Sequence, residues 1–106
     1  MPLPFQLTPR ALNDLDIIWS FIVADSIDAA NRVESAILAA CNSLARNPRL
    51  GSKRIEITSK PVRFWTVSRF PNFIVVYRPE TRPLHVVAIL HGRRNLKALL
   101  NEPGAL

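Results

Sequence analysis

The sequence is poor in cysteine and glycine, with a single cysteine, Cys41, and three glycines among 106 residues. One cysteine cannot form an intramolecular disulfide, and without a secretory leader we expect the protein in the reducing cytoplasm. The scattered glycines provide no glycine-rich loop of the kind that binds nucleotide phosphates. Apolar runs are short as well, far below the roughly 20 residues that a membrane-spanning helix needs. We therefore expect neither a disulfide-stabilised fold, nor a P-loop enzyme, nor a membrane protein.

Groups that ligate metals or act as nucleophiles are also scarce. His85 and His91 are six residues apart, which is not a ligand spacing, and Cys41 is expected on a helix. No serine or cysteine is accompanied by an evident base and orienting group. Asp14 and Asp16 point in different directions on a helix, and we interpret them as charges near a helix terminus. The sequence predicts no metal, no cofactor and no confident catalytic residue.

Apolar side chains and prolines, in contrast, are abundant. Hydrophobic residues make up 48% of the chain, and nine residues are proline. A chain of 106 residues with this composition can bury one core, so we expect residues 1–106 to form a single domain. Several prolines separate the apolar runs of the second half at turn spacing, which favours strands there.

Charge is divided unevenly along the chain. Residues 1–52 hold four arginines against five acidic residues, a net charge of −1. Residues 53–106 hold ten lysines and arginines against three glutamates, a net charge of +7, and seven of the ten are arginines. Arginine presents a planar guanidinium that binds carboxylate or phosphate with two hydrogen bonds. The second half therefore predicts an acidic partner: nucleic acid, an acidic protein surface, or an antagonist protein that masks the basic patch.

Two helices are predicted in the first half. Thr8 followed by Pro9 is typical of a helix start, and apolar residues at three- and four-residue steps predict a helix over residues 9–23. Asp28 is placed to cap a second helix over residues 29–46, whose alanines would let the two helices pack closely as an antiparallel hairpin. The predicted core stripe of the first helix is Leu12, Leu15, Trp19 and Ile22, and Ile17 and Phe21 widen its apolar surface.

The second half is predicted to form strands. Two of the strand-like segments are apolar at both parities and are expected in the middle of a sheet, whereas the segment around residue 65 is expected nearer an edge. A short strand over residues 3–7 opens the chain, and a short basic helix over residues 94–100 ends it. The predicted fold is α+β, with an N-terminal helical hairpin packed on a mostly antiparallel sheet of three to four strands. The strand-like segments are residues 53–57, 62–67, 73–78 and 84–90.

The arginines of the second half gather at two places in this predicted sheet. Odd positions of residues 62–69 share one face, which places Trp65 between Arg63 and Arg69. The segment His91-Gly92-Arg93-Arg94 follows a central strand, so its side chains emerge together at one rim of the sheet. Both places are candidate binding surfaces. For the strand, the alternative is a solvated edge whose arginines only maintain solubility.

Four segments, taken in their order and spacing, resemble the ParE branch of the RelE/ParE toxins. They are LTPRALNDLDIIWSFI, the Asn-Pro-x-x-Gly that starts at Asn47, VRFWTVSRFPNFIVVYR and VAILHGRRNLKALL. The resemblance covers nearly the whole chain. It implies the fold of that family, a helical hairpin packed on a curved antiparallel sheet. It also implies a toxin of a type II toxin–antitoxin module, often described as a plasmid stabilisation system protein.

Members of this superfamily differ in their targets. RelE-type members cut messenger RNA on the ribosome with basic residues of the sheet and a C-terminal tyrosine. Here only the rim arginine is kept, as Arg94, and the other positions align with Trp65, Val67, Ile74 and Leu100. ParE-type members also lack those groups, and they inhibit DNA gyrase by trapping it on cleaved DNA. The resemblance therefore implies gyrase as the target, inhibited without catalysis, and a ParD-like antitoxin as the partner.

The expected contact surfaces follow from these interpretations. We expect a heterotetramer or larger complex with the antitoxin, and no sequence-specific binding of nucleic acid. Residues expected to contact the target are Arg63, Arg69, His91, Arg93 and Arg94, and residues expected to contact the antitoxin are Ile17, Phe21, Trp65 and Arg78. One alternative is a ribosome-dependent ribonuclease of RelE type that uses His91 as acid or base beside the arginines. Another is an inactive toxin, or a plain binding module, that retains only antitoxin binding.

Overall fold

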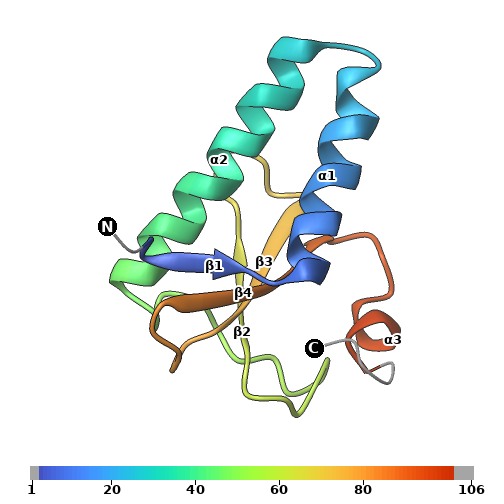
Figure 1. The fold of residues 1–106 in the computed structure, drawn as a ribbon. Coiled ribbons are helices and arrows are strands. Elements are labelled where there is room, and N and C mark those ends of the chain that lie inside the picture. Colours follow the sequence, from blue (N-terminus) through green and yellow to red (C-terminus); the bar gives the residue numbers. More distant parts are fainter. Residues whose placement is uncertain (1–2, 102–106) are drawn as a thin grey trace.

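The structure is a computed structural model, and it describes residues 3–101. Two long helices form a hairpin that packs on one face of a four-stranded sheet, and a short helix packs against the other face (Figure 1). The predicted α+β architecture is confirmed. In chain order the elements are β1 (Phe5–Leu7), α1 (Pro9–Val23), α2 (Ile27–Arg46), β2 (Arg63–Thr66), β3 (Phe73–Arg78), β4 (Leu84–His91) and α3 (Leu96–Leu100).

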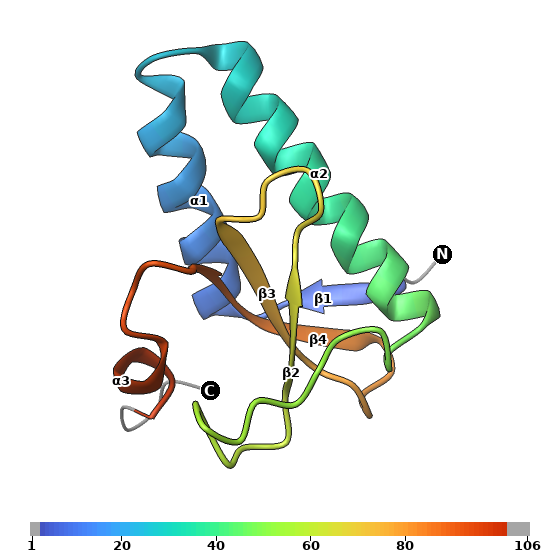
Figure 2. The ribbon, with the colours of Figure 1, turned by 180° about the vertical axis from the view of Figure 1, so that it is seen from behind.

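The sheet has the strand order β1-β4-β3-β2. β3 pairs antiparallel with both β2 and β4, whereas β1 pairs with β4 in parallel. β3 and β4 are therefore the central strands and β2 lies at an edge, as their apolar content predicts. The register between β3 and β4 skips Val87, because Val76 pairs with Ala88 and Tyr77 pairs with Val86. Such a bulge increases the local twist, and the strand directions fan out in Figure 2.

The first helix begins where the sequence predicts, and the second begins two residues earlier. α1 starts at Pro9 with Thr8 as its cap. The cap of α2 is Ser26, whose Oγ accepts a hydrogen bond from the N–H of Ala29 at 3.1 Å. The prediction of Asp28 as the cap is wrong, because Asp28 already lies in the first turn, where its charge interacts favourably with the helix dipole.

The predicted strand over residues 53–57 is also wrong. The segment forms a turn, in which the carbonyl oxygen of Arg54 accepts a hydrogen bond from the N–H of Ile57 at 2.9 Å. Just before it, Ser52 forms an isolated β-bridge to β2. In a strand, Ile55 and Ile57 would lie on the same face and be buried together. Instead, Ile55 is 83% exposed, whereas Ile57 is buried beneath the sheet.

The buried face of α1 is rotated from the predicted one. Ala11 and Leu15 are buried, and Ile18 and Ile22 pack against the core, whereas Leu12 is 54% exposed. The small side chain at position 11 lets the first turns of α1 approach β4 closely. A pattern of large apolar residues does not reveal this face, because the most deeply buried residue of α1 is an alanine, Ala11.

The sheet is buried on both faces. Its helix-side face packs against α1 and α2, and its other face packs against α3 and the turn that follows Ser52. This double burial explains why β3 and β4 are apolar at both parities. Large, fully buried side chains include Tyr77, Ile37 and Leu44 on the helix side and Val76 and Leu100 on the other side.

Candidate functional site

The segment after β4 forms a tight turn with two exposed arginines. The N–H of Gly92 donates to the carbonyl oxygen of Asn72 at 2.7 Å, and the N–H of Arg94 donates to that of His91 at 3.0 Å. The side chains of Arg93 and Arg94 are exposed. The turn thus fixes the backbone while both guanidinium groups remain available to a partner. We call His91, Arg93 and Arg94 the basic rim.

The ring of His91 is oriented by two contacts. Its Nδ1 accepts a hydrogen bond from the N–H of Arg93 at 3.2 Å, and its ring meets that of Phe73 edge to face, with the centroids 5.6 Å apart. Because Nδ1 accepts, this hydrogen-bond pattern assigns the proton of the neutral ring to Nε2. The neutral imidazole therefore offers Nε2–H as a donor, which suits a carboxylate or phosphate oxygen.

A hollow of about 110 Å³ lies between α1 and the end of β4, beside the basic rim. Its wall combines apolar side chains with charged ones, so it differs from the two apolar cores on either side of the sheet. One predicted antitoxin contact, Ile17, lines the hollow together with two predicted target contacts, His91 and Arg94. The lining includes Arg10, Asp14, Ile17, Ile18, His91, Arg94 and Leu99.

Asp14 connects α1 to β4, a role that the sequence did not reveal. Its Oδ2 accepts a hydrogen bond from the N–H of Ile89 at 3.0 Å and lies 3.6 Å from Nε of Arg10. This N–H faces α1 because the pairing with β1 ends at Val86. Burial raises the pKa of Asp14 from its ordinary value, while the Ile89 hydrogen bond and the charges of Arg10 and Arg94 oppose the rise. The carboxylate of Asp14 therefore accepts a hydrogen bond from β4, and its interpretation as a charge at the helix terminus does not describe its role.

We expect Asp14→Asn to stabilise the protein at pH 7 and to lose that advantage in acid. The folded state has the higher Asp14 pKa, so it binds the proton more tightly than the unfolded state, whose pKa lies near 3.8. Stability from this group is therefore fully present below the unfolded pKa and is lost as pH rises through the folded pKa. Asparagine keeps an acceptor for Ile89 and has no charge to desolvate.

Urea unfolding of both proteins between pH 7 and pH 4 measures this effect. The stability difference should shrink as the pH falls. Asp14→Ala is the control for the hydrogen bond, and it should be about 1–3 kcal/mol less stable than Asp14→Asn, because the N–H of Ile89 loses its acceptor. A destabilised Asp14→Asn whose deficit does not vary with pH would contradict the expectation.

Arg63 lies at the opposite end of the sheet from the basic rim. It pairs with Tyr77, four residues along β3 from Phe73, which pairs with the last residue of β4. Four residues along a strand span about 13 Å. Its Nη1 donates to the carbonyl oxygen of Gly51 at 2.7 Å, and its side chain is half-buried. Arg63 therefore helps hold the loop after α2, and the structure does not bring it to the rim.

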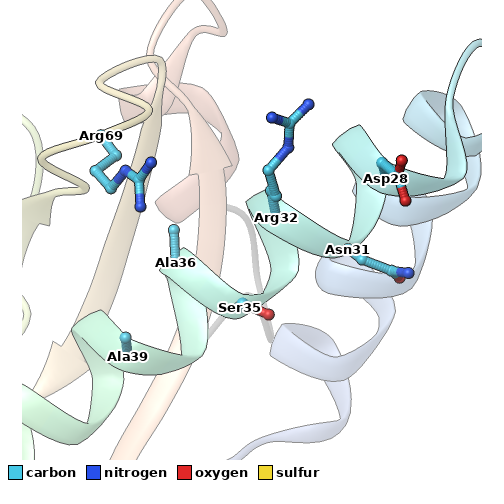
Figure 3. A pocket seen from close by; sticks show the side chains of 7 residues that line it. All are labelled: Asp28, Asn31, Arg32, Ser35, Ala36, Ala39 and Arg69. Atoms are coloured by element: carbon cyan, nitrogen blue, oxygen red, sulfur yellow. The ribbon is translucent and has the colours of Figure 1, made fainter.

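Arg69 is separate from the basic rim as well. It is exposed in the turn between β2 and β3, and it faces α2 (Figure 3). There it lines a hollow of about 660 Å³ together with Arg32 and Ala36 of α2. The predicted target contacts thus fall in three places: the rim, the loop after α2, and the groove beside α2.

The predicted antitoxin contacts lie on different elements. Ile17 and Phe21 are 58% and 77% exposed on α1, so they form an apolar surface without a partner in the described chain. Trp65 is half-buried and lines a hollow beside α2 with Ala40. Arg78 is half-buried at the end of β3. A partner that touches all of them has to extend over both the helices and the sheet.

The positions that align with catalytic groups of RelE-type toxins are apolar and mostly inaccessible. Val67, Ile74 and Leu100 are only 2%, 7% and 0% exposed, and Trp65 is half-buried. The side chains of Val67, Ile74 and Leu100 have no polar atom, so they can neither transfer a proton nor stabilise charge on a phosphate, and the indole of Trp65 is no acid or base. The basic rim, in contrast, presents exposed polar side chains at this end of the sheet.

Comparison with known proteins agrees with these features. Residues 5–96 match the family described as "ParE toxin of type II toxin-antitoxin system, parDE". The chain belongs to the ParE toxin family. Its fold is similar to that of a chain from the chromosomal ParDE toxin–antitoxin system of P. aeruginosa, at 22% identity and a TM-score of 0.68, covering 82% of this chain and 92% of the other. No curated protein matches the sequence.

Two classes of feature are absent from the described part of this ParE-family toxin. Within residues 3–101, no helix is long and apolar enough to cross a bilayer. The same residues contain no group of three or more histidine, cysteine, aspartate or glutamate side chains that could hold a metal ion.

Burial raises the pKa of the Cys41 thiol to about 12, so this thiol is protonated and unreactive at neutral pH.

Proposed function

We propose that this toxin inhibits DNA gyrase and is neutralised by a ParD-like antitoxin. The observation that carries the proposal is the burial of apolar Val67, Ile74 and Leu100 where RelE-type ribonucleases place their catalytic groups. The match to the ParE family over residues 5–96 supports the same choice. The ParE-type toxins that the sequence resembles trap gyrase on cleaved DNA, an activity that depends on contact rather than on bond chemistry in the toxin.

In this proposal, the basic rim contacts the target. Arg93 and Arg94 are exposed on a fixed turn, and His91 offers its Nε2–H beside them. Such donors form charge-assisted hydrogen bonds with carboxylates or phosphates, both of which a complex of gyrase and DNA presents. Binding that favours the cleaved complex slows religation, and no bond within the toxin forms or breaks.

Pulse labelling after induction of the toxin alone tests this proposal. DNA synthesis should stop before protein synthesis does. An early halt of translation with cut messenger RNA would contradict the proposal and favour a ribonuclease that uses His91 as acid or base. A folded protein without any effect on growth would instead indicate an inactive toxin that retains only antitoxin binding.

The antitoxin is proposed to cover the apolar surface of α1, with Trp65 and Arg78 as further contacts, in a heterotetramer or larger complex. Ile17 and Phe21 would be buried by apolar side chains of the antitoxin. We expect Ile17→Asp/Phe21→Asp to weaken antitoxin binding at least about 10-fold, because two carboxylates would lose their hydration in the interface.

Titration calorimetry with the purified antitoxin measures this loss. The control is Ile55→Asp, a single apolar-to-aspartate change at a side chain that is 83% exposed on a turn far from α1 in the sequence. The control should bind like the wild-type protein, and all variants should unfold at similar urea concentrations. Unchanged affinity of the α1 variant would show that the antitoxin does not bind there.

A further inference from the structure

A groove runs along α2 beside the turn between β2 and β3. It consists of two hollows of about 660 and 240 Å³ that share Ala36, Ala39 and Arg69. Its lining on α2 extends from Asp28 to Ser43. At 1.5 Å per residue, this part of the helix is about 22 Å long. The groove, which we call the α2 trough, is therefore long enough for a peptide segment.

One end of the α2 trough is basic. Arg32 and Arg69 rise from opposite walls, one on α2 and one on the turn, with Ala36 on the floor between them (Figure 3). Both arginines are exposed, and within residues 3–101 neither forms an ion pair. Asp28 lines the same hollow, but its carboxylate points away from the guanidinium of Arg32. A carboxylate placed between the two guanidinium groups would relieve their mutual repulsion.

The other end of the α2 trough is mainly apolar. Trp65 and Ala40 line it, and Ser43 closes the row along α2. The indole of Trp65 is half-buried, so it offers a rigid surface against which an apolar side chain can pack at little entropic cost. A ligand that fits the whole trough thus carries an acidic group near one end and apolar side chains toward the other.

We propose that the α2 trough binds an acidic segment of the antitoxin, with a carboxylate between Arg32 and Arg69 and apolar side chains over Ala39 and Trp65. The inference rests on the antitoxin partnership of the proposed function and specifies the chemistry of one contact. The net charge of +7 in residues 53–106 favours an acidic partner. The proposal assigns Arg69 to the antitoxin rather than to the target, because Arg69 faces α2 and not the basic rim.

Calorimetric titration of the toxin with its antitoxin, the protein whose co-expression restores growth, tests the proposal. Arg32→Glu/Arg69→Glu should raise the Kd at least about 30-fold and weaken its dependence on salt. The control Arg49→Glu/Lys53→Glu changes the net charge equally at two exposed residues of the loop after α2. It should change the Kd less than about 3-fold, as expected for charges outside the interface.

A charge exchange identifies the contact itself. Each acidic residue of the antitoxin is replaced in turn by arginine, and one replacement should restore binding to Arg32→Glu/Arg69→Glu while weakening binding to the wild-type toxin. Such reciprocal rescue requires that the two groups meet, which a general effect of charge does not produce.

The outcomes separate this proposal from the one on which it rests. If the wild-type toxin binds no antitoxin, the partnership fails and the α2 trough proposal fails with it. If Arg32→Glu/Arg69→Glu binds as tightly as the wild type, the partnership stands and the trough proposal is wrong. If that variant loses affinity only for a DNA fragment used as a second probe, the trough is a nucleic-acid surface and the proposal is again wrong.

Discussion

Reversing the charges of Arg93 and Arg94 together should lower the potency of gyrase inhibition at least about 100-fold, because arginines at the centre of an interface commonly contribute 2 kcal/mol or more each. Both side chains are exposed on a turn whose backbone is fixed by the hydrogen bonds of Gly92 and Arg94. Glutamates at these positions would repel the carboxylates or phosphates that the arginines are proposed to bind. The double variant should therefore fold normally and fail at the target.

The measurement is the toxin concentration that gives half-maximal inhibition of supercoiling by purified gyrase. Arg49→Glu/Lys53→Glu is again the matched control, since it carries the same charge change on exposed residues of the loop after α2. The control should retain potency within a few-fold. Full potency of the rim variant, in a protein with wild-type unfolding behaviour, would remove the basic rim from the target surface.

Gly51→Ala should destabilise the fold by about 3 kcal/mol, through overpacking and the loss of a buried hydrogen bond. The hydroxyl of Tyr77 accepts a hydrogen bond from the N–H of Gly51 at 2.9 Å and donates one to the carbonyl oxygen of Pro48 at 2.6 Å. A Cβ at position 51 would lie 2.5 Å from that hydroxyl and 2.8 Å from the carbonyl oxygen of Phe64. The backbone oxygen cannot rotate away, so the loop after α2 must shift.

Gly92→Ala is the matched control for this prediction. A Cβ there would lie 3.5 Å from Cδ1 of Ile74 and 3.6 Å from the carbonyl oxygen of Asn72, which are ordinary contacts. Its cost should stay below about 1 kcal/mol, the range typical of surface changes. Urea unfolding of both variants gives the comparison. Equal stability of the two variants would mean that the contact with Tyr77 does not limit the residue at position 51.

Much of the fold could be predicted because its signals are local. The cap and proline at the start of α1 fixed that boundary, and the apolar runs of β3 and β4 identified them as central strands. The turn after Ser52 could not be predicted, because alternation alone does not say whether Ile55 is buried. The face of α1 that packs on the sheet could not be predicted for a related reason: its most deeply buried residue is Ala11, which a pattern of large apolar residues does not reveal.

The geometry of the candidate site is less predictable from the sequence, because most of its contacts form only through long-range packing. The basic rim is the exception, since its residues lie within four consecutive positions. The contact between Asp14 and the N–H of Ile89 joins residues 75 positions apart, and no spacing rule connects them. Nor does the sequence single out Arg32, since its position opposite Arg69 depends on how the turn between β2 and β3 packs against α2.

The hollow between α1 and β4 suggests how neutralisation works in the proposed function. Ile17, a proposed antitoxin contact, lines this hollow together with His91 and Arg94 of the basic rim. An antitoxin that buries Ile17 would therefore lie against the rim and obstruct the target sterically. A second contact in the α2 trough would add affinity from a surface that the target does not need.

Gyrase-dependent cleavage of supercoiled plasmid by the purified toxin tests the central claim most directly. Gyrase, ATP and plasmid are incubated with increasing toxin, and the linear DNA released by detergent and protease is measured. We expect linear DNA to accumulate with the wild-type toxin and to disappear when the antitoxin is added. Absence of linear DNA at toxin concentrations that arrest growth, together with cut messenger RNA in the same cells, would contradict the claim that this ParE-family toxin acts on gyrase.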